Sequence, residues 1–199
     1  MILRLTPWAA ALLLTACAST PPMQATAPSA HDPGQIRHWI MEGRIALRSG
    51  QDGWQANVYW EHDGPQEKLR LSGPLNQGMV SIIIQSDLLY LNEGDGKVTV
   101  AHDPDALLRE RLGYTLPLQA LHHWMLGQAD PRTPGAHSTL SADGQLQSLE
   151  QDGWTLQFER YEQIEGSPFH LPHKLIAEGH DLRLKWILDA WHAVPDTTH

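Results

Sequence analysis

Apolar and polar residues alternate over residues 39–47, and this period of two is the feature that most constrains the fold. Charged residues such as Glu42 and Arg44 fall on one face and apolar residues on the other, as a half-buried strand requires. Residues 54–60 repeat the pattern after a short connection that ends in Asp52-Gly53. Asp-Gly is a strong hairpin signal because both turn positions need positive φ. The ordered part of the chain therefore begins with an antiparallel hairpin.

Further alternating runs continue to the end of the chain and bring the expected total to about ten strands, mostly in sequential hairpins. An antiparallel sheet of this size rarely stays flat, so we expect it to curl. These further runs are residues 69–71, 80–84, 88–90, 98–100, 146–151, 154–158, 175–177 and 182–188.

Two short helices are predicted between the two groups of strands. Asp103 and Pro104 have the residue types of an N-cap and a first helical position, and Gly113 ends the first helix. The second helix starts at Pro117 and closes at Gly127. Short amphipathic helices are not stable alone in water. We therefore expect both helices to lie over the concave side of the sheet.

The only cysteine, Cys17, follows a short apolar run over residues 7–14 and the small residues Thr15 and Ala16. The run is too short to span a bilayer, and Arg4 precedes it as in a secretory signal. We expect residues 1–16 to be a signal peptide, with Cys17 as a lipid anchor. The alternative is an ordinary signal peptide with an incidental cysteine.

The segment after the cysteine is rich in Pro, Ser and Ala and cannot bury enough apolar surface to order itself. We expect residues 17–35 to be a flexible tether and residues 36–199 to form one domain. Whether residues 35–40 form a helical turn or an early start of the first strand stays open. The formal charge of −9 argues against nucleic acid as a partner.

No catalytic motif is present: the chain has no nucleophile elbow, phosphate loop or His-Glu-x-x-His. His122 and His123 are adjacent and point about 100° apart on a helix, which is poor for chelation. His170 and His173 are separated by Pro172 in an expected loop. We expect no catalytic residue, metal site or cofactor, with weak metal binding by the histidines as the alternative.

Eight tryptophans against two phenylalanines are an unusual aromatic content. Four of them lie on strand faces expected to point inward, and they fill an ordinary core or border an apolar cavity between the curved sheet and the helices. These four are Trp54, Trp60, Trp154 and Trp186. A second anomaly is Leu75, an apolar residue without a periodic partner in the loop of residues 72–78. A lone surface leucine is also an ordinary feature.

Several motifs together resemble the LolB family of outer-membrane lipoprotein receptors. They are the cysteine motif at Cys17, Trp39, Gly43-Arg44-Ile45, a second strand ending in Trp60, Leu71-Ser72-Gly73-Pro74-Leu75, and Trp124-Met125-Leu126-Gly127. The resemblance implies a mainly β fold, an unclosed antiparallel barrel of about 10–11 strands with helices as a lid over an apolar cavity.

The resemblance also implies a function without enzyme activity, metal or nucleotide. The protein would take acylated lipoproteins from the periplasmic carrier LolA and insert them into the outer membrane, acting as a lipid-anchored monomer that faces the periplasm. Cys17 matches the lipidated cysteine, and Pro74 and Leu75 match a membrane-insertion loop, although Asn76 follows where the family usually has glycine. Strand parity and the matched aromatic positions give the expected cavity residues: Ile45, Leu47, Val58, Trp60, Leu69, Leu71, Val80, Ile82, Trp124 and Trp154.

Two other functions stay open at this point. A lipid-anchored envelope scaffold or assembly factor would have the same sheet with a filled core. A metal- or histidine-dependent hydrolase is the more distant alternative.

Overall fold

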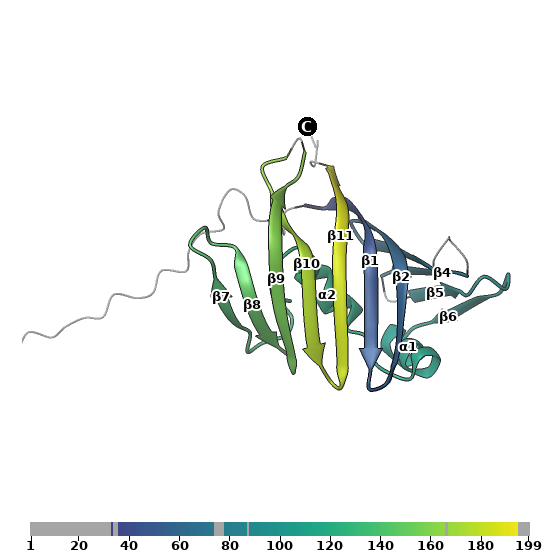
Figure 1. The fold of residues 1–199 in the computed structure, drawn as a ribbon. Helices are drawn as coiled ribbons and strands as arrows, with labels where there is room; N and C mark the ends of the chain where they lie inside the picture. Colours follow the sequence, from purple (N-terminus) through teal and green to yellow (C-terminus); the bar gives the residue numbers. More distant parts are fainter. Residues whose placement is uncertain (1–32, 34–35, 74–77, 87, 166, 195–199) are drawn as a thin grey trace, which may run out of the picture.

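The computed structural model describes residues 33, 36–73, 78–86, 88–165 and 167–194. These residues form an eleven-stranded sheet and two helices (Figure 1). The strands are β1 (His38–Ser49), β2 (Asp52–Asp63), β3 (Gln66–Ser72), β4 (Met79–Gln85), β5 (Leu88–Asn92), β6 (Val98–Ala101), β7 (His137–Leu140), β8 (Leu146–Gln151), β9 (Trp154–Gln163), β10 (His170–Gly179) and β11 (Leu182–Val194). The helices are α1 (Pro104–Leu112) and α2 (Leu118–Met125).

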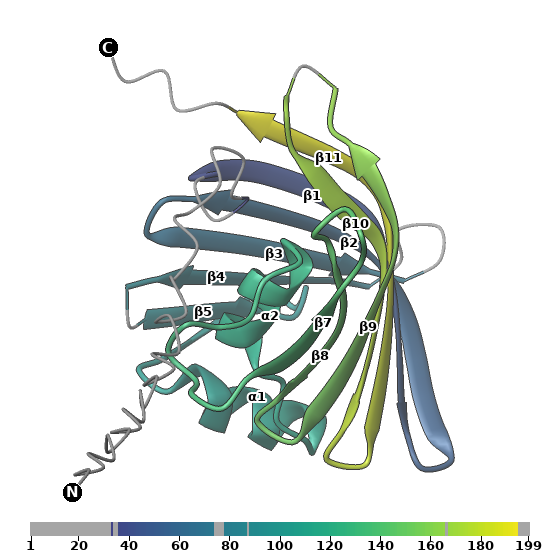
Figure 2. The same ribbon diagram turned by 90° about the vertical axis from the view of Figure 1, so that its left-hand side faces the viewer.

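All strand pairs are antiparallel, and the order is β6-β5-β4-β3-β2-β1-β11-β10-β9-β8-β7. β1 and β11 pair in the middle, so the first and last strands join two arms that are otherwise built from local hairpins. β6 and β7 are the two edges, and the sheet curls without closing (Figure 2). The expected unclosed antiparallel fold is confirmed.

Both helices lie on the concave side of the sheet, in the connection between its two edge strands (Figure 2). The Asp103 carboxylate accepts a hydrogen bond from the Ala106 amide at 2.9 Å and caps α1. Gly113 ends α1 with a φ of 83°, a conformation that costs a residue with a Cβ more than glycine. Gly127, just after α2, has a φ of 72° and closes that helix in the same way.

One strand, β7, was not predicted from the sequence. All four of its residues are exposed and it pairs with β8 alone, so it has no buried face to impose alternation. The structure also favours an early start of the first strand, because β1 begins at His38. Before it, the Ile36 amide donates to the Pro33 carbonyl at 3.0 Å.

The core lies between the concave face and the helices and is largely leucine and tryptophan. Trp39, Trp124 and Trp186 are the largest side chains that are almost fully buried. Among the described residues, no helix combines the length and apolarity that crossing a membrane requires.

The β1–β11 pair contains a bulge at Glu42 and Gly43, where the two backbones approach closely. A Cβ at Gly43 would overlap the backbone carbonyl oxygen of Ile187. On the next residue, the Arg44 guanidinium donates to both carboxylate oxygens of Asp189 at 2.9 and 2.8 Å. Gly43 thus fits the bulge because it has no side chain, and Arg44 stabilises the bulge through an ion pair with the neighbouring strand.

We predict that Gly43→Ala lowers the free energy of unfolding by about 3 kcal/mol, because the obstructing atoms are backbone and cannot rotate away. Ala46→Ser, on the same strand and half-buried, is the control and should change stability by about 0.5 kcal/mol or less. Urea denaturation measures both. Equal stability of the two variants would contradict a steric requirement at the bulge.

Candidate functional site

An apolar pocket of about 320 Å³ lies between the first arm of the sheet and the two helices. Its volume lies at the lower end of the range for small-molecule sites. The lining is almost wholly hydrocarbon, and its polar exceptions are confined to a few positions. The lining residues are Ile45, Trp54, Ala56, Leu69, Leu71, Ser72, Gly73, Gly78, Val80, Ile82, Leu91, Glu93, Leu108, Arg111, Leu112, Leu116, Leu118, Leu121, Leu184 and Trp186.

Half of the expected cavity residues line this pocket. They share one face of β1, β3 and β4, and the strand register places them opposite one another across the sheet: Leu71 pairs with Val80 and Leu69 with Ile82. The members of this group are Ile45, Leu69, Leu71, Val80 and Ile82.

The other expected cavity residues lie elsewhere in the core. Leu47 and Val58 are buried but are not among the lining residues. Trp60 borders a second pocket next to the first. Trp124 and Trp154 pack against each other, with ring centroids 6.0 Å apart, where α2 meets the second arm. Alternation places a residue on the inner face of the sheet, but it does not say which inner position remains uncovered.

The residues on either side of positions 74–77 border the apolar pocket. Ser72 and Gly73 precede these positions, Gly78 follows them, and all three line the pocket. Pro74 and Leu75 lie outside the described residues, and so does Cys17. The charged groups that line the pocket are Arg111 and Glu93, and an Arg111 guanidinium nitrogen lies 3.6 Å from a Glu93 carboxylate oxygen. This ion pair links helix α1 to the connection between β5 and β6.

The second pocket measures about 340 Å³ and carries a polar cluster that sequence reasoning missed. His62 on β2 and His122 on α2 both direct Nδ1 at Oε1 of Glu67 on β3, at 2.8 and 2.9 Å. The indole N–H of Trp60 donates to the other carboxylate oxygen, Oε2, at 2.6 Å. The hairpin signal Asp63-Gly64 sets the register that pairs His62 with Glu67. The proximity of these two residues could therefore have been predicted from the sequence. Nothing local in the sequence connects His122 to them.

Glu67 is an ionised carboxylate despite its burial. Burial alone would raise its pKa, but the rings of His122 and His62 outweigh that effect and hold the pKa at about 2. Trp39 stacks on His62 at 5.5 Å between ring centroids and lies beside His122 at 5.6 Å. The cluster is therefore a charged group surrounded by aromatic side chains.

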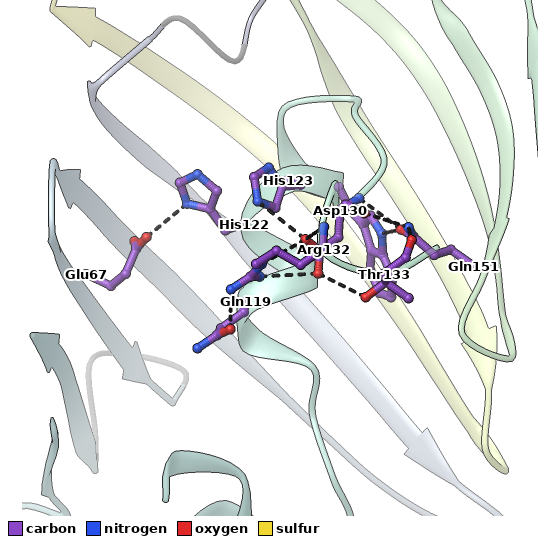
Figure 3. Close-up of polar contacts among 9 residues, drawn as sticks. Glu67, Gln119, His122, His123, Asp130, Arg132, Thr133 and Gln151 are labelled. Atoms are coloured by element: carbon purple, nitrogen blue, oxygen red, sulfur yellow. Dashed lines mark hydrogen bonds and ion pairs between the residues drawn. The ribbon is translucent and has the colours of Figure 1, made fainter. Parts of the chain in front are cut away.

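The other side of α2 is held by Gln151, a buried residue of β8 (Figure 3). Its Oε1 accepts from the Trp124 indole N–H at 3.0 Å and from the Asp130 amide at 2.9 Å. Its Nε2 donates to the carbonyls of Asp130 and Thr133, both at 2.8 Å. One side chain thus fastens the end of the lid helix and the following turn to the second arm.

Asp130 and its neighbours complete this attachment (Figure 3). Burial would raise the pKa of the Asp130 carboxyl, but hydrogen bonds from Arg132 outweigh burial and keep the pKa below its ordinary value. Arg132 also donates to the Gln119 side chain on α2. Burial and the neighbouring His122 lower the pKa of His123, whose Nε2 lies 3.7 Å from Asp130.

We predict that Gln151→Met loosens the lid and lowers the free energy of unfolding by about 3 kcal/mol or more. It leaves the Trp124 N–H and the polar backbone of Asp130 and Thr133 without partners, at about 1–3 kcal/mol for each group that stays dry. The matched control is Gln147→Met, on the exposed face of the same strand. Hydrogen exchange of the α2 amides should accelerate in the first variant alone. Unchanged exchange in Gln151→Met would contradict the role of this residue in holding the lid.

The fold and the site define a lidded, unclosed antiparallel barrel with an apolar pocket. A family model described as "Outer membrane lipoprotein LolB" matches residues 37–191. The chain belongs to the LolB family. It is 32% identical to the outer-membrane lipoprotein LolB of Nitrosococcus oceani over 191 residues, which covers 90% of this chain and 92% of that protein.

Other relatives agree. The outer-membrane lipoprotein LolB of Thiobacillus denitrificans is 30% identical over 92% of this chain and 93% of that protein. Among solved structures, a LolA superfamily protein from Nitrosomonas europaea has 9% identity and a TM-score of 0.49, and the match covers 83% of this chain and 92% of that chain. That likeness is too distant to bear on function.

Proposed function

We propose that this protein is an outer-membrane lipoprotein receptor that holds the acyl chains of lipoproteins in the apolar pocket and inserts them into the outer membrane. Membership of the LolB family supports the receptor role. The observation that carries the binding mode is the pocket itself, a hydrocarbon-lined space that the two helices cover.

Acyl chains require such a space because exposing them to water is costly. Each buried CH₂ contributes about 0.8 kcal/mol, so a dozen methylene groups contribute on the order of 10 kcal/mol. A pocket of about 320 Å³ holds a limited length of chain, so the remainder of a lipoprotein's acyl groups needs the lid to move. Helix α1, which buries only Leu107 and Leu108, is better suited to such movement than α2, which buries five residues.

Cargo would arrive from the carrier LolA and leave to the bilayer without fuel, down a series of increasing affinities. In this proposal Cys17 carries the lipid, residues 1–16 are the signal peptide, and the segment from residue 17 to 35 tethers the domain on the periplasmic side. The domain would act as a monomer, with no nucleic acid partner and no cofactor that takes part in the transfer itself. Leu75 would enter the membrane from a loop whose flanking residues border the pocket.

We predict that Leu71→Trp abolishes acyl binding by filling the space at the pocket, where Leu71 is only half-buried. The Leu71→Trp domain without residues 1–17 should then show no change in tryptophan fluorescence when an apolar dye is added. It should also not accept a lipoprotein from LolA. Val100→Trp is the control, since Val100 is 53% exposed and does not line the pocket. A folded Leu71→Trp variant with normal acceptance would instead favour a scaffold with a filled core.

We predict that Leu75→Glu lowers delivery into liposomes at least about tenfold, because burial of one leucine in a bilayer contributes about 1.5–3 kcal/mol. Receipt of cargo from the carrier should stay unchanged. Gln77→Glu is the matched control, because it adds the same charge to the same loop without removing apolar surface. Normal delivery by Leu75→Glu, or equal loss in both variants, would remove Leu75 from the mechanism.

A further inference from the structure

Two histidines and a carboxylate from three separate elements meet at the second pocket. They are His62 on β2, Glu67 on β3 and His122 on α2, and one ligand atom of each lies within 4.8 Å of the other two. Two imidazoles with one carboxylate are a donor set typical of zinc. We propose that His62, Glu67 and His122 bind one zinc ion, which joins the lid helix to the sheet.

The distances require only a small adjustment. Ligand atoms of a tetrahedral zinc site lie about 3.3 Å apart, given Zn–N and Zn–O bonds of about 2.0–2.1 Å. The Nδ1 atoms of His62 and His122 lie 2.8 and 2.9 Å from the Glu67 Oε1. An outward shift of about 0.5 Å by each ring therefore makes room for the ion. The ligand atoms of the two imidazoles lie within 4.8 Å of each other, so rotation of these side chains has to bring them to the same spacing.

The His122 Nδ1 lies 2.9 Å from the Glu67 Oε1, and this contact is drawn as a dashed line in Figure 3. The His122 Nδ1 is buried and has no well-formed hydrogen bond among the described residues. A buried polar atom that lacks a well-formed hydrogen bond is uncommon and costly. A bound ion would satisfy this atom through its lone pair.

Groups around the three ligands hold them in place. Trp60 donates to Glu67 Oε2 at 2.6 Å, which fixes the carboxylate and leaves Oε1 for an ion. The Trp39 ring lies against both imidazoles. Partners of this kind orient the ligands of metal sites and strengthen them.

The site is accessible enough to load from solution. The side chains of His62, His122 and Glu67 are 14%, 17% and 21% exposed, and the adjoining pocket of about 340 Å³ has room for water as a fourth ligand. Calcium and magnesium prefer sites made of oxygen, so a site with two nitrogen ligands should discriminate against them.

Zinc would clamp α2 onto the β2–β3 hairpin, opposite the attachment at Gln151. The effect of the clamp on cargo entry rests on the proposed function, since it assumes that the lid moves to admit acyl chains. Zinc binding itself does not depend on that assumption. Failure to accept cargo alongside normal zinc binding would therefore count against the proposed function alone.

The test uses the full mature chain in detergent micelles, stripped with a chelator and titrated with zinc by calorimetry. We expect one ion per chain, with no heat from calcium or magnesium. His62→Gln, Glu67→Gln and His122→Gln should each weaken binding about 100-fold or more, and Trp60→Phe about tenfold or more. His123→Gln, adjacent on the same helix, is the control and should stay within about twofold.

Two measurements on the unaltered protein keep the test independent of variant folding. X-ray absorption of the zinc-loaded chain should show two imidazole ligands, and zinc at 100 times its Kd should raise the Tm by about 5 °C or more. Absence of stoichiometric binding would overturn the proposal. So would full retention of affinity in His62→Gln and His122→Gln, or an absorption spectrum without imidazole ligation.

Discussion

The pairing of β1 with β11 is the interaction on which the rest of the structure depends. It joins strands from the two ends of the described chain, whereas every other strand pair lies within a hairpin or between neighbours in sequence. Contacts this distant in sequence carry the largest loop-closure entropy and form slowly. The glycine at the bulge and the Arg44–Asp189 pair lie on this seam. Without the seam the sheet would be two separate arms, and no concave face would exist for the helices to cover.

The lid is held between the two arms by attachments of different character. On the second arm, Gln151 makes four hydrogen bonds in a dry environment and fixes the end of α2. On the first arm, His122 meets an ionised carboxylate beside a pocket that opens to solvent. A fully satisfied buried network is rigid, whereas a part-exposed charged contact is adjustable. The side of α2 that faces the first arm, beside the second pocket, is thus the one better suited to movement.

Local sequence signals predicted most of the elements. Alternation gave ten of the eleven strands, and the Asp103–Gly113 punctuation gave α1, because each signal acts over a few residues and matches a period or a cap. β7 was not predicted because an edge strand exposed on both faces has no alternation of apolar and polar residues. The family motifs gain physical reasons from the structure: Gly43 lies at a crowded bulge, and Gly127 takes a positive φ against the Tyr161 ring. The expected roles of Cys17 and Leu75 stay predictions.

The sequence by itself determined the class of fold, the antiparallel hairpins and the apolar inner face, because these depend on periodicities that a linear chain displays. Only the tertiary structure decided which inner residues border open space. Leu71 and Val80 line the pocket while Leu47 and Trp124 are covered, since coverage depends on where two helices lie across the sheet. It also decided the meeting of His62, Glu67 and His122. His122 comes from the connection between the sheet's edges, and no spacing along the chain records which strand such a helix will contact.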